Sequence, residues 1–305
     1  MKFCRNSVAL VLCILATFLA TSAQVRGLYP PGMSATYSGI TPGPGFSYVN
    51  QLLIYSRSTM RDRNGKITAT GNNSVILDMN SFVWVSKKEF LGGARFSMSA
   101  TLPIARNSLT NEATGPISGA SGFGDSYYQP FILGWNKERV AVRAVYGFLA
   151  PTGRYEAGRN DNVGSGYWTH VFASGQTVYL TKKKATTFSA FQMYEFHTRQ
   201  PGTNIHPGQT FDLDFSLMHA IRLRGDRSFQ VGLIGYNQYQ TTDKKGPTIT
   251  PQQAKDYYKV NALGFATQVA LPKQRLNFGF KYFKEFANKS TFQGYSVQLT
   301  GAYKF

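Results

Sequence analysis

Apolar and polar residues alternate along much of this chain, most clearly in residues 291–305. One set of alternate positions there is largely aromatic or aliphatic and the other is small or polar: Tyr295, Val297, Leu299, Gly301, Tyr303 and Phe305 against Ser296, Gln298, Thr300, Ala302 and Lys304. A period of two residues is that of a β-strand with one apolar face. The sequence therefore predicts a strand over residues 290–305.

The same alternation, bounded by turn-forming residues, occurs in earlier parts of the chain. It predicts eleven further strands, which gives twelve in all: 46–57, 73–86, 93–104, 126–136, 139–150, 166–181, 185–197, 209–223, 228–240, 257–271 and 274–286. A tilted strand crosses a membrane with about 9–11 residues. Each predicted strand is therefore long enough for a membrane crossing, and the fold class is all-β.

The connections between these strands alternate in length. Short ones near residues 137–138, 182–184 and 272–273 are followed by long polar ones, such as 105–125, 151–165 and 241–256. Up-and-down barrels of the bacterial outer membrane have tight turns at one end and long loops at the other. We therefore predict that residues 46–305 form a single closed antiparallel up-and-down transmembrane β-barrel of about twelve strands, with ten or fourteen as the alternatives. The last strand would close it.

Residues 1–23 have the pattern of a signal peptide, with Lys2 and Arg5 before an apolar stretch and small residues at the end. Both cysteines of the chain, Cys4 and Cys13, lie in this segment. Its removal would leave an exported chain without thiol or disulfide chemistry. We predict neither a cofactor nor a metal site.

Residues 24–45 contain two clusters of proline and glycine, which do not suit a paired strand. We therefore predict an irregular N-terminal arm before the barrel. Its apolar residues, among them Leu28, Tyr29 and Met33, would be poorly placed in open solvent. The arm is accordingly expected to enter the barrel and act as a plug, and the alternative is a disordered tail.

Polar residues at alternate strand positions are candidates for a polar lumen. They are Asp78, Asn80, Arg143, Asp212, Asp214, Gln230, Lys281 and Gln298. Two strands do not resolve into faces, 166–181 and 185–197, because Gln192 shares its face with Phe188 and Tyr194. In the first of them Ser174 and Gly175 are interpreted as a β-bulge.

Three segments resemble one family of outer-membrane proteins. They read SGFGDSYYQPFILGW at 121–135, GFLAPTGRYEAG at 147–158 and NVGSGYWTHVFASGQTVYL at 162–180, and residues 27–46 match its Pro/Gly-rich opening. They are similar to the family associated with the meta pathway of phenol degradation. The residues that match its motifs are Gly122, Gly124, Asp125, Pro151, Thr152, Gly153 and Tyr155.

The resemblance implies a β-barrel in the outer membrane of a Gram-negative bacterium. It also implies passive diffusion of small hydrophobic or aromatic compounds, without a catalytic role for the motif residues. In such proteins the terminal aromatic, here Phe305, belongs to the signal read by the barrel-assembly machinery.

The formal net charge of +18 is open to two interpretations. Many basic residues lie in the predicted turns, as at 182–184, and dispersed charges of this kind fit anionic lipid headgroups and lipopolysaccharide better than nucleic acid. Two other functions stay open: a barrel that conducts nothing, and an outer-membrane enzyme. The latter would use His170 or His197 with Asp212.

Overall fold

One antiparallel sheet accounts for nearly all of the structure. The computed structural model describes residues 26–90, 92–113, 115–159, 161–223 and 225–305, so the predicted signal peptide lies outside the described residues. The strands in this part of the chain are β1 (Gly45–Arg61), β2 (Ile67–Phe90), β3 (Ala94–Asn111), β4 (Gly115–Phe123), β5 (Ser126–Asn136), β6 (Val140–Ala150), β7 (Thr169–Tyr179), β8 (Thr186–His197), β9 (Thr210–Arg222), β10 (Ser228–Gln240), β11 (Lys259–Leu271), β12 (Leu276–Glu285) and β13 (Thr291–Lys304).

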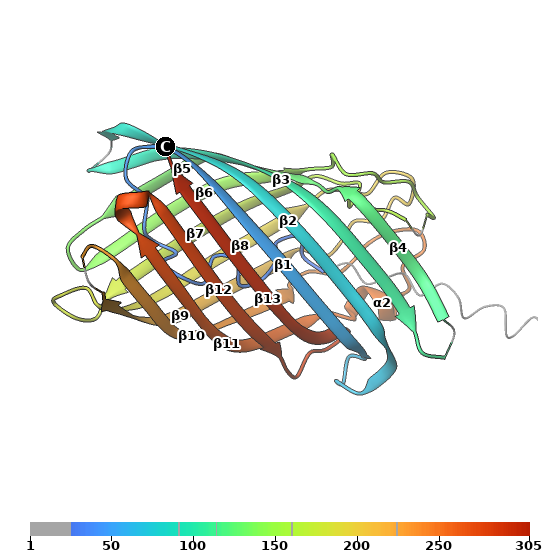
Figure 1. Ribbon diagram of the computed structural model, residues 1–305. Helices are drawn as coiled ribbons and strands as arrows, with labels where there is room; N and C mark the ends of the chain where they lie inside the picture. Colours follow the sequence, from blue (N-terminus) through green and yellow to red (C-terminus); the bar gives the residue numbers. More distant parts are fainter. Residues whose placement is uncertain (1–25, 91, 114, 160, 224) are drawn as a thin grey trace, which may run out of the picture.

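The sheet closes on itself through its first and last strands (Figure 1). β1 pairs with β13 from Ser47 opposite Lys304 to Arg61 opposite Thr291, and its other edge pairs with β2. Every other neighbour in the ring is adjacent in sequence except β3 and β5, which pair across β4. The predicted closed barrel of twelve antiparallel strands is confirmed, and the described residues add one extra strand.

The extra strand is β4, in a region predicted to be a long polar loop. β4 pairs with the C-terminal half of β3, from Ile104 opposite Phe123 to Asn111 opposite Gly115. The N-terminal half of β3 pairs with β5. Pro103 lies where β3 changes its partner, and its ring nitrogen has no proton to donate. The prediction of a loop over 105–125 was therefore wrong, because a hairpin extends the sheet beyond the ring.

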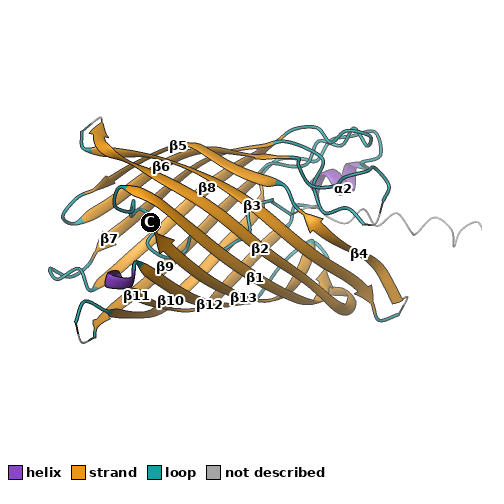
Figure 2. Ribbon diagram, turned by 45° about the horizontal axis from the view of Figure 1, so that its top comes forward, coloured by secondary structure: helices purple, strands orange, loops and turns teal. Residues whose placement is uncertain are grey.

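The two ends of the barrel differ, as Figure 2 shows. We call the end with the short connections 137–139, 180–185 and 272–275 the turn end, and the opposite end the loop end. The loop end carries the connections 151–168, 198–209 and 241–258 and the one α-helical turn of the described residues, α2 (Pro251–Lys255). At the turn end a 3₁₀ turn, η1 (Pro272–Gln274), joins β11 to β12. No helix in the described residues is long and apolar enough to cross a membrane.

Alternation along each strand separates an apolar outer face from the interior. On β13, Tyr295, Leu299 and Tyr303 are exposed, and so is Phe305 directly after the strand. Val297 is on the same face, since it pairs with the outward-facing Ile54. The intervening Ser296 and Gln298 are buried inside the barrel. The closing strand therefore presents an apolar surface outward, as an outer-membrane barrel requires.

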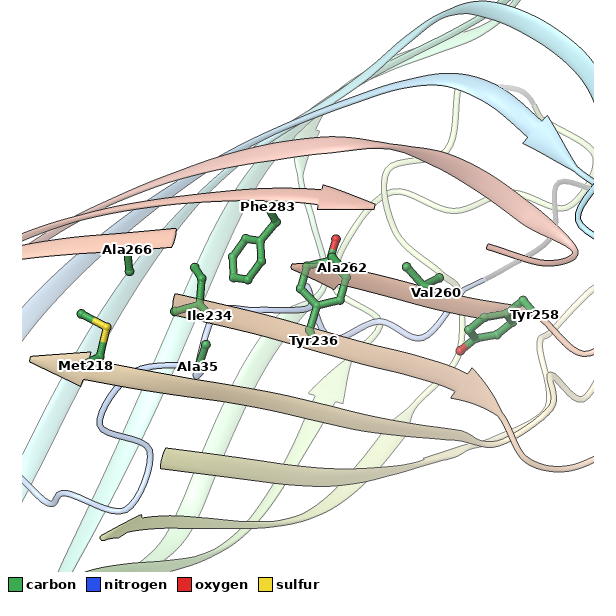
Figure 3. Packing of buried hydrophobic residues seen from close by; sticks show 9 residues of the cluster. All are labelled: Ala35, Met218, Ile234, Tyr236, Tyr258, Val260, Ala262, Ala266 and Phe283. Carbon is green, nitrogen blue, oxygen red and sulfur yellow. The ribbon is translucent and has the colours of Figure 1, made fainter. Parts of the chain in front are cut away.

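Part of the interior is packed with apolar side chains (Figure 3). Strands β9–β12 contribute most of one buried cluster, and the arm contributes to it through Ala35: Ala35, Met218, Ile234, Tyr236, Tyr258, Val260, Ala262, Ala266 and Phe283. The Tyr236 and Phe283 rings lie 4.9 Å apart between their centroids. This side of the lumen is therefore filled, and the arm is part of the filling.

Deletion of Phe305 is expected to impair assembly of the barrel. Its backbone N–H donates to the Phe46 carbonyl at 3.0 Å, and its ring contacts Phe46 and Tyr303. The deletion removes the last contacts of the seam between β1 and β13, which has to close for the facing edges of these two strands to be paired. We expect a lower outer-membrane yield and less heat-modifiable protein on gels. The control is Phe131→Ala, which removes an equally outward aromatic far from the seam; equal yields of the two variants would contradict the prediction.

Candidate functional site

The N-terminal arm lies inside the barrel and runs along most of its length (Figure 1, blue trace). Near the loop end, the Arg26 guanidinium donates to Glu285 Oε1 at 3.2 Å and to Thr291 Oγ1 at 2.7 Å. Near the turn end, Thr41 exchanges hydrogen bonds with the Asn136 side chain at the end of β5. The arm therefore connects opposite ends of the lumen before it enters β1.

Two buried carboxylates hold the first part of the arm. Glu195 on β8 accepts hydrogen bonds from the backbone N–H groups of Leu28 at 2.8 Å and Tyr29 at 3.3 Å. Asp214 on β9 accepts from the Tyr29 hydroxyl at 2.6 Å, and from the N–H groups of Gly32 at 2.8 Å and Ser34 at 3.1 Å. In each of these contacts the arm supplies the donor and a wall carboxylate is the acceptor.

Donors on other strands bind the carbonyl groups of the arm. Lys281 Nζ on β12 donates to the carbonyls of Gly32 at 2.9 Å and Met33 at 2.7 Å. Gln298 on β13 donates to Pro31 O at 3.0 Å, and Gln238 on β10 donates to Tyr29 O at 3.1 Å. An irregular segment buried in a barrel needs partners for its backbone groups. The lumen-facing polar residues supply them.

The second part of the arm approaches the wall so closely that glycine is required. A Cβ atom on Gly39 would lie 2.1 Å from Ala141 O, and one on Gly175 would lie 2.1 Å from Ser38 O. The register of β6 and β7 is continuous through Ser174 and Gly175. The predicted β-bulge is therefore wrong, because this glycine serves the contact with the arm instead.

The structure places most of the predicted lumen residues inside the barrel. Asp212, Asp214, Lys281 and Gln298 are buried there, and Arg143 lines a cavity. Gln230 pairs with Gln268 on β11 and shares its inward face with Ile234. Asp214, Lys281 and Gln298 come together on the arm, whereas Arg143 lies on the far side of it.

Asp78 and Asn80 are the exception, because both lie on the outer face. They alternate with Leu77 and Met79, which face the cavity, and Asp78 pairs with the outward Ile104. The predicted lumen position of these two residues is therefore wrong. The cause is that β2 has apolar residues on both faces, since its inner face lines an apolar cavity. Outside, Asp78 and Asn80 accept hydrogen bonds from Asn50, and Asn80 also accepts one from Tyr48.

Sequence reasoning missed the two carboxylates that bind the start of the arm, Glu195 and Glu285. The strand that contains Glu195 did not resolve into faces because Gln192 is polar but faces outward, where it accepts a hydrogen bond from Ser174. Glu285 forms the ion pair with Arg26. A carboxylate on the same face as Phe191 and Met193 was the available signal for Glu195.

An apolar cavity of about 950 Å³ remains between the arm and the wall formed by β1–β3, β5 and β6. Its lining extends from residues 155–165 at the loop end to Val49 and Val83 toward the turn end. The apolar lining includes side chains from the arm, β2, β6 and β8: Met33, Leu77, Met79, Leu149, Phe191 and Met193. Such a cavity suits a small apolar or aromatic molecule.

The family motifs meet at the loop-end side of this cavity. Asp125 Oδ1 accepts the Gly153 N–H at 3.0 Å, and Asp125 Oδ2 accepts both the N–H and the hydroxyl of Ser165 at 2.7 and 2.6 Å. Gly153 and Gly164 are in contact, and a Cβ on either would lie less than 3 Å from the other. Asp125 therefore holds the connection 151–165 over the cavity.

Neither histidine of the enzyme alternative forms a catalytic arrangement with Asp212 among the described residues. His170 shares a hydrogen bond with Tyr146 on the outer face. His197 is buried, and its two ring nitrogens contact the hydroxyls of Thr169 at 2.8 Å and Thr210 at 3.2 Å. It is not part of the cavity lining.

Comparisons with known proteins agree with this architecture. The chain is similar to the crystal structure of the COG4313 outer membrane channel from Pseudomonas putida F1, at 13% identity over 91% of this chain and 100% of that one, with a TM-score of 0.70. It is also similar to the β-domain of the Bordetella autotransporter BrkA, at 11% identity over 86% of this chain and 100% of that one, with a TM-score of 0.53. No curated protein sequence matches it.

At such identities the two structures show the fold alone, a barrel of the Gram-negative outer-membrane type. A family match shows more than the fold. It extends over residues 57–301 and includes the motifs around Asp125. The chain belongs to the family described as MetA-pathway of phenol degradation.

Proposed function

We propose that this protein is an outer-membrane channel through which small hydrophobic or aromatic compounds diffuse passively. The observation that carries the proposal is the apolar cavity of about 950 Å³ inside the closed barrel. Barrels of about eight strands are filled by side chains or hold one small ligand, and barrels of about 16–18 strands leave a water channel, so a ring of twelve strands has room for a narrow path. Two further facts support the proposal: membership of a family named for phenol degradation, and the fold shared with a Pseudomonas outer membrane channel.

In this proposal the turn end faces the periplasm and the loop end faces the outside. The basic turns would contact anionic headgroups, and the loops would contact lipopolysaccharide. The terminal aromatic would be recognised by the barrel-assembly machinery. The arm would act as a plug that leaves the cavity open to an apolar or aromatic solute while it obstructs water and inorganic ions, and no catalysis is involved.

The proposal predicts that filling the cavity slows permeation. Leu77 lines the cavity, whereas its neighbour Ile76 faces outward on the same strand. We expect Leu77→Trp to reduce the uptake of a neutral aromatic probe such as benzyl alcohol into proteoliposomes several-fold, because the larger ring occupies the path. The matched control Ile76→Trp should leave the uptake unchanged, since it adds the same ring to the outer face.

The alternative of a barrel that conducts nothing makes the opposite prediction. Proteoliposomes with the wild-type protein would then take up the aromatic probe no faster than protein-free vesicles. Equal rates for wild type and Leu77→Trp, with both above the protein-free vesicles, would show a path that avoids the cavity. Either result would reject the proposed route.

A further inference from the structure

Two arginines face the cavity without a counter-ion. Arg57 on β1 and Arg143 on β6 both line it. The described residues form no ion pair or hydrogen bond with either guanidinium, and the Nε atom of each is buried without a partner. Arg57 lies instead over the ring of Phe292, 4.4 Å from its centroid. A buried charge of this kind is normally paired.

The acidic residues of the interior are engaged elsewhere. Glu285, which is close to Arg57, forms an ion pair with Arg26 and accepts hydrogen bonds from the hydroxyls of Tyr55 and Tyr236. Glu195 and Asp214 bind the arm, Asp212 accepts a hydrogen bond from Gln238, and none of these three lines the cavity. None of these carboxylates therefore forms an ion pair or a hydrogen bond with Arg57 or Arg143.

One carboxylate does line the cavity, and it is also satisfied. Asp125 accepts three hydrogen bonds from Gly153 and Ser165 in the connection 151–165. Arg159, in the same connection, has its own partner in Asp161 at 3.1 Å. Of the described charges on the cavity wall, Arg57 and Arg143 are thus the ones free to bind a solute.

We infer that the cavity binds and passes aromatic carboxylates, with Arg57 and Arg143 as the groups that receive the carboxylate. A guanidinium presents a planar set of donors that matches the two oxygens of a carboxylate. The apolar wall formed by Leu77, Met79 and Phe191 would receive the ring. A strongly hydrated inorganic anion would gain nothing from that wall. This inference rests on the proposed channel function and specifies its substrate class.

The positions of the two arginines indicate a path as well as a site. Arg57 lies opposite Asn73 in the half of β1 that is nearer the loop end. Arg143 lies opposite Gly134 and Gly175, near the start of β6 at the turn end. A carboxylate that enters from the loop end would meet Arg57 first and Arg143 later.

Calorimetric titration of the full-length protein in lipid nanodiscs tests the inference, with benzoate and its neutral analogue benzamide as probes. We expect wild type to bind benzoate at least about tenfold more tightly than benzamide, since a hydrogen bond to a charged group is lost with the neutral analogue. Arg57→Gln and Arg143→Gln should each weaken benzoate binding about tenfold, with little effect on benzamide. The matched control is Arg106→Gln, which removes an outward-facing arginine and should change neither affinity.

Equal affinity of wild type for the two probes would overturn the inference, and so would a benzoate preference that survives in the double variant. The wild-type comparison decides the question even if a variant fails to fold. The uptake of benzyl alcohol separates this inference from the proposed function. If benzyl alcohol passes but benzoate is not preferred, the channel function is supported and the carboxylate site is rejected. If benzoate binds through the arginines but no aromatic compound passes, the carboxylate site is supported and the channel function is rejected.

Discussion

A variant that lacks residues 26–44 is expected to conduct ions several-fold better than the full barrel in planar bilayers. The arm contacts the wall from Glu285 at the loop end to Asn136 at the turn end. Its removal leaves the lumen of a twelve-stranded ring without the segment that occupies one side of it. Single-channel conductance at fixed salt measures the effect directly.

The control for this deletion is Thr36→Ala, which changes an arm residue but leaves the chain of contacts in place. It should conduct like wild type. The same current with and without the arm would show that the arm does not obstruct the lumen. Digestion of the arm by protease added to the intact protein would support the same conclusion, since a docked arm is protected by the wall.

Asp214→Ala is expected to release the arm without removing it. The substitution deletes a buried carboxylate that accepts hydrogen bonds from Tyr29, Gly32 and Ser34. Hydrogen bonds to charged groups contribute about 1.5–3 kcal/mol each, so the docking of the arm should weaken by roughly 3 kcal/mol or more. Conductance should rise toward that of the deletion. A cysteine placed by Ala35→Cys, which is fully buried in the docked arm and does not line the cavity, should become reactive to a maleimide reagent.

Asp78→Ala provides the matched control for Asp214→Ala. Asp78 is also a carboxylate at an alternating strand position, but it faces outward and binds Asn50 rather than the arm. Its removal should change neither the conductance nor the reactivity of the cysteine at position 35. If the two alanine variants behave alike, Asp214 does not hold the arm.

The two carboxylates Asp214 and Asp78 also show how far the sequence predicts this structure. On β9, apolar residues such as Phe211 and Leu213 alternate strictly with Asp212 and Asp214, and both the strand and the inward direction of the carboxylates follow from the pattern. On β2, Leu77 and Met79 are as apolar as the outward residues. The direction of Asp78 therefore depends on what the lumen contains, which the strand itself does not specify.

The arm and its binding residues illustrate a second limit. Proline and glycine at 30–32 correctly exclude a strand, yet the course of the arm is determined by residues more than 150 positions later in the sequence, such as Glu195 and Lys281. The strand β4 was not predicted because its glycine- and serine-rich sequence lacks the alternation of apolar side chains. Patterns of period two predict strands well, but they do not predict which long-range partners a turn-rich segment will find.

The route of the arm also constrains the order in which the barrel is built. Its hydrogen-bonding partners belong to strands from β5 to β13, so no complete binding surface for it exists until those strands have formed. Once β1 and β13 have paired, the arm would have to thread through the closed ring for Arg26 to reach Glu285 near the loop end. The simpler sequence of events is that the arm settles on a curved, still open sheet and the seam then closes over it. In that case the arm is a template on which the barrel closes, as well as a segment that occupies the lumen.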